Sequence, residues 1–363
     1  MRFVLLALVP ALLGGPPEVS HAMTDGEVER IVAQEIKPLL PADAAGGVAV
    51  AVHFEGRTLF FNYGFADLAE KRPVTSDTLF NLASIRKTFE AVLLAQAVKQ
   101  GELDLDDPVA RYVVELQHGD HIRRVTLGQL ATHTSGLLLP TDHPPWPEKG
   151  YTLAEFIETL NSWTPQQEPG RQHTYTHAGY VLLALALERR FATPIAELLA
   201  RRVLAPLGMT STFLPDGGLS PALARRAVQG YSQDGDPIGA PGDQQGYFDF
   251  PGTGQMFSSA RDLAIFLAAH LGDVAVAPVL REAMQLATQG VFRISARNTQ
   301  ALAWEVNDFG GPVIVDKPGG LNNASTYIGM VPQRRLGLVI LSNRGEQAPH
   351  ELARRILLPA LAR

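Results

Sequence analysis

The sequence predicts an α/β (α+β) chain in which strands from both termini form one antiparallel sheet, helices flank that sheet, and a helical lobe is inserted. Three observations predict this fold: alternating residues near the N-terminus, helical periodicity broken by Pro/Gly loops in the middle, and strand-like runs in the last third. The 363 residues suffice for a two-lobed unit with a sizeable core. We expect a sheet lobe from residues 23–80 and 290–363, a mainly helical lobe from residues 81–289, and an active cleft between them.

The N-terminal half of the predicted sheet begins with a hairpin. Residues 47–53 and 57–63 alternate around "EGR", which predicts two antiparallel strands. The next segment, "SIRKTFEAVLLAQAVKQG", has apolar residues at helical spacing and a glycine stop at Gly101. Within the middle of the chain, "YVLLALALERRF" and "IAELLARRVLAPLG" read as buried or half-buried helices. Residues 258–272, "SSARDLAIFLAAHLG", have the serine start and glycine stop of another helix.

The last third of the chain changes back to strand patterns. "ALAWEV", "GPVIVDKPGG", "STYIGMVP" and "LGLVILSN" are rich in β-branched and aromatic residues, and "QRR" separates the last two as a hairpin turn. "QAPHELARRILLPALA" has the periodicity of a closing amphipathic helix. These runs supply the other half of the sheet and a second flanking helix.

Composition excludes several classes of function. The net charge is −6 and no basic tract stands out, so nucleic acid is not an expected partner. Cysteine is absent, which excludes disulfides, thiolate metal sites and a cysteine nucleophile. The expected partner is a small-molecule substrate, and we expect the protein to act as a monomer.

The N-terminus has the pattern of a secretory signal. Residues 1–22 contain a single arginine, an apolar run too short to span a bilayer as a helix, a Pro/Gly break, and a Ser-His-Ala end. We expect cleavage after Ala22 and a periplasmic or secreted protein without a stable membrane span. A buried N-terminal helix is the alternative reading of this run.

One pair of residues could carry nucleophilic chemistry. Ser84 and Lys87 lie three residues apart where the first long helix is predicted to begin, so both side chains would lie on one helix face, one turn apart. The positive end of the helix dipole would favour an alkoxide at Ser84. By itself S-x-x-K is a weak motif, since a helix-capping serine and a solvated lysine give the same pattern.

Two later segments supply possible partners for this pair. "YTHAGYVLL" places Tyr175 and His177 just before a buried helix, where they could either pack or face a cleft. "DKPGG" places Lys317 on a late strand, followed by Gly319 and Gly320. Glycines let the backbone come close to a ligand, and an exposed strand N–H could donate to an oxyanion.

The order and spacing of the three motifs resemble the signature of the penicillin-recognising serine hydrolases: S-x-x-K, a Tyr-x-polar motif about 90 residues later, and K-x-G on a late strand. The resemblance is closest to class C serine β-lactamases and their esterase and D-amino-acid-peptidase relatives. It extends over about residues 35–360, through blocks such as "VTLGQLATHTSGL", "EPGRQHTYTHAGY" and "KPGGLNNASTYIGMVPQRRLGLVILSN". It implies a β-lactamase/transpeptidase-like fold.

The resemblance also implies a role for each motif residue. Ser84 would attack a carbonyl, and Lys87 would accept its proton or share it with Tyr175. Lys317 would lower the pKa of the tyrosine and attract a substrate carboxylate. The N–H groups of Ser84 and Gly320 would form the oxyanion hole, and water would hydrolyse the acyl-enzyme with help from the tyrosine. No metal or organic cofactor is implied.

Substrate contacts would come from His177, Pro318, Gly319 and Asn322, and two of these residues depart from the class C pattern. His177 stands where asparagine is usual, and its neutral ring has one donor and one acceptor nitrogen. Pro318 replaces a threonine or serine, so the hydroxyl that would bind a β-lactam carboxylate is missing. The expected activity is β-lactam hydrolysis, with an esterase or D-amino-acid peptidase as the alternative.

Other classes of function have weaker support. A penicillin-binding sensor without turnover would keep the same motifs, and only the lifetime of an adduct on Ser84 would distinguish it. "HGDH" places His118 and His121 three residues apart, but without H-E-x-x-H or an obvious third metal ligand. Ser135 in "THTSGL" lacks a G-x-S-x-G elbow, so we expect a loop or capping role.

Overall fold

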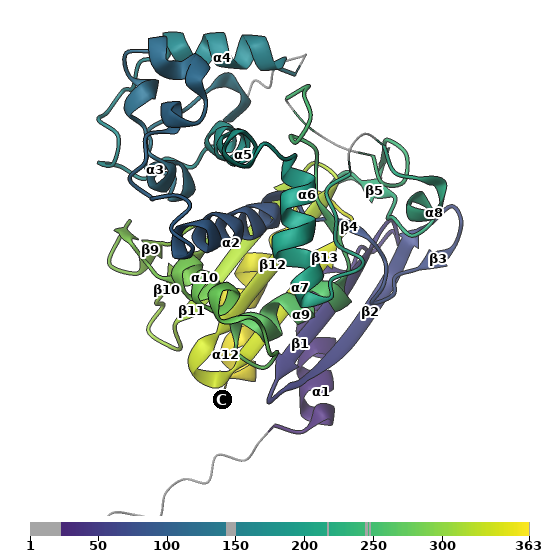
Figure 1. Cartoon of the computed structure of the whole chain (residues 1–363). Coiled ribbons are helices and arrows are strands. Elements are labelled where there is room, and N and C mark those ends of the chain that lie inside the picture. Colours follow the sequence, from purple (N-terminus) through teal and green to yellow (C-terminus); the bar gives the residue numbers. More distant parts are fainter. Residues whose placement is uncertain (1–22, 143–149, 216–217, 244–245, 247, 363) are drawn as a thin grey trace, which may run out of the picture.

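The computed structural model of the chain describes residues 23–142, 150–215, 218–243, 246 and 248–362; the signal peptide predicted over residues 1–22 lies outside them. Its centre is a nine-stranded sheet with helices on both faces (Figure 1). The strands, in spatial order, are β3 (Arg72–Pro73), β2 (Arg57–Asp67), β1 (Gly47–Phe54), β13 (Leu336–Ser342), β12 (Ala324–Val331), β11 (Ile314–Leu321), β10 (Glu305–Asn307), β9 (Asn298–Gln300) and β8 (Phe292–Arg293).

Both ends of the chain contribute to this sheet, and β1 and β13 join the two contributions. These strands pair antiparallel, from Val48 opposite Ser342 to Phe54 opposite Leu336. The neighbouring pairs β1–β2, β12–β13 and β11–β12 are antiparallel as well. The predicted antiparallel sheet built from both termini is therefore confirmed. Two short pairs lie outside it: β4 (Phe80–Asn81) with β7 (Phe257–Ser258), and β5 (Gly230–Tyr231) with β6 (Pro237–Ile238).

The central strands are buried on both faces because each face has its own layer of helices. In β1, Ala49 and Ala51 belong to the larger core, whereas Val48, Val50 and Val52 belong to the smaller one. This alternation follows from the two-residue period of a strand. Burial on both faces also explains the continuous apolar runs of β12 and β13.

The helices divide between the two faces and a separate group. The smaller core is closed by α1 and the C-terminal helices, and the larger one by α2, α9 and α10. Figure 1 shows α3, α4 and α5 grouped away from the sheet, with α2 between that group and the strands. The helices are α1 (Asp25–Glu35), α2 (Arg86–Lys99), α3 (Leu127–Ala131), α4 (Leu153–Ser162), α5 (His177–Phe191), α6 (Ile195–Leu199), α7 (Ala205–Leu207), α8 (Pro221–Ala224), α9 (Ala260–His270), α10 (Pro278–Thr288), α11 (Pro349–Leu352) and α12 (Leu358–Leu361).

Two predicted elements differ from the structure. Ser84 does not begin the long helix: it lies in a 3-10 turn, η2 (Ala83–Ile85), and α2 begins at Arg86. The run "ALAWEV" forms a strand only from Glu305 onward. Its first residues turn instead, because Ala303 adopts a left-handed φ of 61° and the N–H of Ala301 donates to the carbonyl of Trp304 at 2.8 Å.

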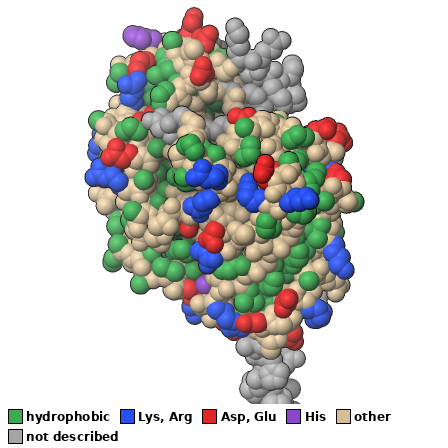
Figure 2. Space-filling view, turned by 90° about the vertical axis from the view of Figure 1, so that its right-hand side faces the viewer, with side chains coloured by type: hydrophobic (Ala, Val, Ile, Leu, Met, Phe, Trp, Pro, Cys, Tyr) green, Lys and Arg blue, Asp and Glu red, His purple; other side chains and the backbone are tan. Residues whose placement is uncertain are grey.

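Surface charge is mixed on the face shown in Figure 2, where Lys and Arg side chains are interspersed with Asp and Glu. None of the helices within the described residues has both the length and the apolar character needed to cross a bilayer.

Candidate active site

Ser84 and Lys87 lie one turn apart at the junction of η2 and α2. Ser84 Oγ accepts a hydrogen bond from Lys87 Nζ at 3.4 Å, and both residues are more than nine-tenths buried. The preceding residue, Ala83, has a left-handed φ of 48°, a conformation that few residues with a side chain adopt. The amide oxygen of Asn81 accepts the N–H of Ala83 at 3.0 Å and stabilises this turn. The tight turn thus holds the serine close to its lysine.

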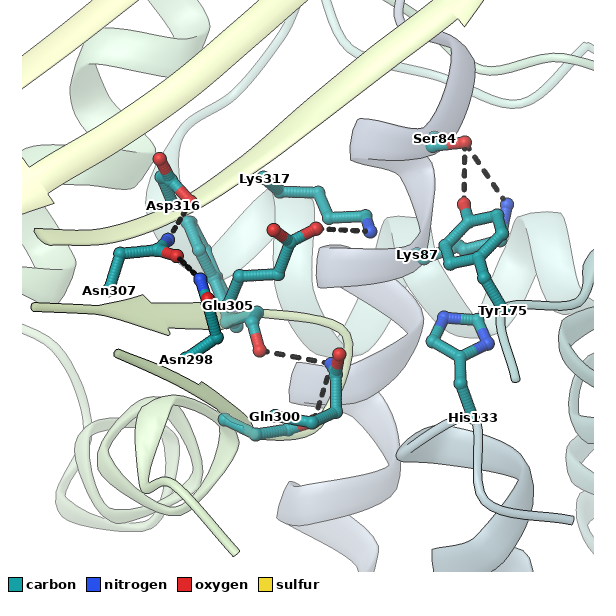
Figure 3. Close-up of polar contacts among 12 residues, drawn as sticks. Ser84, Lys87, His133, Tyr175, Asn298, Gln300, Glu305, Asn307, Asp316 and Lys317 are labelled. Carbon is teal, nitrogen blue, oxygen red and sulfur yellow. Dashed lines mark hydrogen bonds and ion pairs between the residues drawn. The ribbon is translucent and has the colours of Figure 1, made fainter. Parts of the chain in front are cut away.

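Tyr175 reaches the same hydroxyl from a distant part of the chain. Its OH lies 2.8 Å from Ser84 Oγ and is the donor in this bond (Figure 3). The tyrosine precedes α5, whose N-cap Thr176 accepts the N–H of Gly179 at 3.1 Å. Cap and helix therefore fix the backbone that carries the phenol. Ser84, Lys87 and Tyr175 together are called the serine side below.

Two ammonium groups lie against the phenol ring of Tyr175. Lys317 Nζ lies 4.6 Å and Lys87 Nζ 5.6 Å from the ring centre. Burial raises the pKa of this phenol, but the two positive charges and the hydrogen bonds to Ser84 and Lys87 outweigh burial, so its pKa lies below the ordinary value. A phenol with a lowered pKa, hydrogen-bonded to a serine, is a suitable general base.

Lys317 is fixed by a chain of alternating charges on the sheet. Its side chain on β11 is 2% exposed, and Nζ lies 3.4 Å from Glu305 Oε1 on β10. Glu305 in turn binds Arg354 at 2.8 Å, and Arg354 makes two hydrogen bonds with Asp316, at 2.7 and 2.8 Å. The hydroxyl of Tyr327 also donates to Asp316, at 2.8 Å. Lys317, Glu305, Arg354 and Asp316 are called the strand side below.

Charge balance decides the ionisation of Glu305 within this chain. Burial raises the pKa of its carboxyl, but Lys317 and Arg354 together lower it further than burial raises it, so the pKa lies below its usual range. Glu305 is therefore a carboxylate at neutral pH, and it holds the Lys317 ammonium in place.

The K-x-G segment lies directly against the backbone of the serine turn. A Cβ on Gly319 would lie 2.7 Å from the carbonyl oxygen of Leu82 and 3.1 Å from the nitrogen of Ser84, so only glycine fits. Thr326 Oγ1 on β12 donates to the same carbonyl at 3.0 Å and holds the turn to the sheet. Gly320 is exposed, and a side chain there would project into open space.

Of the sequence-predicted substrate residues, His177 contacts this group directly. His177 begins α5; its backbone N–H donates to Asp142, and its ring meets Tyr175 edge-on at 5.4 Å. Burial, followed by the charges of Lys87 and Lys317, lowers the pKa of His177 to about 3, so the imidazole is neutral at pH 7. Of the other predicted contacts, Pro318 is half-buried in β11, and Asn322 is exposed in the turn after that strand.

Sequence reasoning missed four residues around the predicted motifs: His133, Asp142, Glu305 and Arg354. His133 lies beneath Tyr175 in Figure 3, and its left-handed φ of 55° has no clear sequence signal. One sequence signal could have indicated Glu305: it is a carboxylate in the strand-like run that precedes the run carrying Lys317. Nothing in the local sequence indicates that Arg354, near the C-terminus, reaches Asp316.

Ser135 and His121, which the sequence offered as candidates, do not belong to this group. Ser135 is buried, and its hydroxyl accepts the N–H of Leu137 at 3.2 Å, which is a loop role. The ring of His121 lies at hydrogen-bond distance from Arg124, with 3.5 Å between His121 Nδ1 and Arg124 Nη2. The described part of the chain contains no group of three or more His, Cys, Asp or Glu that could hold a metal ion.

Comparisons with known proteins agree with this geometry. The family model "Beta-lactamase" matches residues 29–361. A β-lactamase of Pseudomonas fluorescens is 27% identical over 349 residues, which cover 88% of this chain and 94% of that protein. The structure of a class C β-lactamase from Rhodobacter sphaeroides superposes with a TM-score of 0.79 at 27% identity, covering 91% of this chain and 98% of the other. A D-alanine carboxypeptidase from Burkholderia cenocepacia gives a TM-score of 0.80 at 28% identity, covering 92% and 99%.

The fold and these matches show that the chain is a serine hydrolase of the β-lactamase type, with a β-lactamase/transpeptidase-like fold. The family follows from the extent of the match. The chain belongs to the β-lactamase family, whose model covers it from residue 29 to residue 361.

Proposed function

We propose that the protein is an exported hydrolase that opens the amide of β-lactams through an acyl-enzyme on Ser84. The observation that carries the proposal is the 2.8 Å contact of the Tyr175 hydroxyl with Ser84 Oγ, next to the ammonium groups of Lys87 and Lys317. Names of relatives support it, since the P. fluorescens relative is a β-lactamase. Export is supported by the signal-like sequence of residues 1–22.

Acylation requires a base that removes the proton of the serine hydroxyl. In its deprotonated form Tyr175, with Lys87 beside it, would take this proton as Ser84 Oγ attacks the carbonyl carbon. Backbone N–H groups of Ser84 and Gly320 would stabilise the negative charge that develops on the carbonyl oxygen. The same proton would then pass to the ring nitrogen of the β-lactam as its C–N bond breaks.

Deacylation would reuse the same groups. A water molecule would give its proton to the Tyr175–Lys87 pair and attack the acyl carbon, and Ser84 would leave with that proton restored. Lys317, held by Glu305, would keep the pKa of the phenol low through both steps and attract an anionic group of the substrate. No step of this scheme requires a metal or a cofactor.

A second candidate substrate class follows from Pro318 and His177. Proline has neither a side-chain hydroxyl nor a backbone N–H to offer a carboxylate, and neutral His177 has a single ring donor. Both features affect substrate recognition and not the nucleophile. An ester, or a peptide ending in D-alanine, is therefore the alternative to a β-lactam, and one structural neighbour is described as a D-alanine carboxypeptidase.

One experiment separates these candidates. Purified protein and its Ser84→Ala variant are incubated with nitrocefin, a p-nitrophenyl ester and a D-Ala-D-Ala peptide, and turnover is measured together with the mass of the protein. The proposal expects nitrocefin turnover and a short-lived adduct on Ser84. Cleavage of the ester or peptide alone would reassign the substrate, and a long-lived adduct would indicate a sensor. Full activity of Ser84→Ala would overturn the proposal.

A further inference from the structure

His133 contacts residues 174–176, the segment that carries Tyr175, at three points, although it lies outside the three motifs. Its carbonyl oxygen accepts the N–H of Thr174 at 2.7 Å, and its ring Nδ1 accepts the N–H of Thr176 at 3.3 Å. One residue therefore binds the backbone immediately before and immediately after the tyrosine. The left-handed φ of His133, 55°, lets the carbonyl and the ring reach the same segment.

The ring of His133 also supports the phenol directly. Its centre lies 4.2 Å from that of Tyr175, with 35° between the planes, and Figure 3 shows the imidazole directly below the tyrosine. On its other sides the imidazole meets Tyr180 at 5.1 Å and His173 at 5.9 Å. His133 is fully buried, so this packing leaves the phenol no space to move away from Ser84 on that side.

The two ring nitrogens of His133 are used unequally. Because Nδ1 is an acceptor, the proton of the neutral ring is on Nε2, which is buried and has no acceptor among the described residues. An unpaired buried donor costs about 1–3 kcal/mol. A phenyl ring would avoid that cost but would remove the acceptor for Thr176. The arrangement thus makes sense if the acceptor is what matters.

The imidazole remains uncharged in this setting. Burial, and then the charges of Lys317 and Lys87, hold the pKa of His133 well below its usual value, and His173 and His177 also face it. A protonated ring would lose its acceptor and place a third cation beside the phenol. Neutral His133 avoids both effects at neutral pH.

We propose that His133 is a positioning residue for Tyr175: its carbonyl and Nδ1 hold the backbone on both sides of the tyrosine, and its ring supports the phenol at hydrogen-bond distance from Ser84. The inference deepens the proposed function and rests on it for the role of Tyr175. Its acceptor is the part that should matter most, because the backbone contacts set where the phenol points.

Three variants separate acceptor from ring. His133→Asn keeps an acceptor oxygen in the place of Nδ1 and tolerates a positive φ, so acylation should stay within about threefold of wild type. His133→Phe keeps a ring without the acceptor, and His133→Gly tolerates the backbone but lacks both. In these two variants the acylation rate should fall about tenfold to a hundredfold, the cost of a misplacement near 1 Å, with KM changed less than about threefold.

His270→Phe is the matched control, because His270 has another buried Nε2 without a partner among the described residues. Its half-buried side chain, at the end of α9, meets Phe266 and Trp304 edge-on. It should change the melting temperature without changing the acylation rate. A folded His133→Asn that loses tenfold or more, or a folded His133→Phe or His133→Gly with wild-type acylation, would overturn the inference.

A second readout does not depend on turnover. The phenolate absorbance of Tyr175, taken as the difference from Tyr175→Phe, should titrate below the ordinary tyrosine range in wild type and His133→Asn. It should move up toward that range in His133→Phe and His133→Gly as the phenol moves away from Lys317. If wild type gave no adduct on Ser84 with any probe, the proposed function would fail, and this titration would still decide the role of His133.

Discussion

Lys87 and Lys317 both lie against the ring of Tyr175, yet the structure supports them in opposite ways. On the serine side, Lys87 contacts a hydroxyl and two aromatic rings, and no carboxylate lies within ion-pair distance of it among the described residues. On the strand side, Lys317 begins a chain of alternating charges through Glu305 and Arg354. One lysine therefore contacts the serine hydroxyl, whereas the other is held by a carboxylate.

Two lysines that contact the same phenol ring therefore differ in whether a carboxylate pairs with them. Pairing with a carboxylate stabilises the charged form of a lysine, so a fully paired lysine is a poor proton acceptor. Lys87 has no such partner among the described residues and contacts the Ser84 hydroxyl instead.

Replacement of Lys87 should strongly slow acylation at the serine side without lowering the stability of the fold. Lys87→Met should lower the acylation rate by about a thousandfold, within the range that general acid–base groups contribute. The free energy of unfolding should stay the same or rise, because a buried cation without a carboxylate partner is removed. Stopped-flow acylation and urea unfolding measure the two effects. A large loss of stability would show that Lys87 is a structural residue.

Replacement of Arg354 should disrupt the chain of charges on the strand side, and the effect should appear as a loss of folding stability. Arg354→Met leaves the buried carboxylate of Asp316 without its cation, which should cost about 3–5 kcal/mol of unfolding free energy. Arg355→Met is the matched control, since the neighbouring Arg355 has a 78% exposed side chain and pairs with Glu351 on the surface. This control should change the unfolding free energy by less than about 1 kcal/mol. Equal effects of the two variants would contradict the network.

Replacement of Glu305 should change the pH dependence of acylation. In Glu305→Gln the Lys317 charge is no longer balanced, so the pKa of Tyr175, already lowered, should fall further. In the proposed mechanism the phenolate is the base, so the acid limb of the acylation profile should move to lower pH. Glu351→Gln, an exposed control, should leave the limb in place. A shift to higher pH would mean that Glu305 acts only by orienting Lys317.

Acid stability should depend on His270, a histidine that belongs to neither side. Burial lowers the pKa of His270 to about 3, whereas the unfolded value is 6.5. Below pH 6.5 the unfolded state binds the extra proton, so this residue destabilises the fold as pH falls from 6.5 toward 3, by up to about 1.4 kcal/mol per pH unit. His270→Phe should flatten unfolding free energy against pH in that window. An unchanged slope would show that His270 is protonated in the folded state.

The smallest effect is expected at Pro318. Pro318→Thr would supply a hydroxyl beside Lys317, and one added hydrogen bond should raise kcat/KM for a carboxylate-bearing β-lactam by about twofold to tenfold. A neutral p-nitrophenyl ester should be unaffected, which makes it the internal control. Equal gains with both substrates would mean that the proline limits the backbone and not carboxylate binding.

The local parts of this protein could be predicted from its sequence. Strand alternation near the N-terminus, strand-like runs near the C-terminus and helical spacing between them predicted the antiparallel sheet, because side-chain periodicity is a property of the element itself. The contact of Ser84 with Lys87 was predictable for the same reason. Three residues of helical backbone determine their separation, even though Ser84 lies in a 3-10 turn and not in α2.

Tertiary structure alone decided the rest. The contact of Tyr175 with Ser84 joins residues 91 positions apart. Strand pairing brings Lys317 to Glu305, and docking of the C-terminal helices brings Arg354 to Glu305. His133 owes its role to a left-handed backbone conformation that its residue type permits but does not require. Such contacts depend on how elements pack across the core, and no spacing along the chain encodes that distance. The sequence by itself therefore determined the elements and the serine–lysine pair, whereas packing decided what surrounds them.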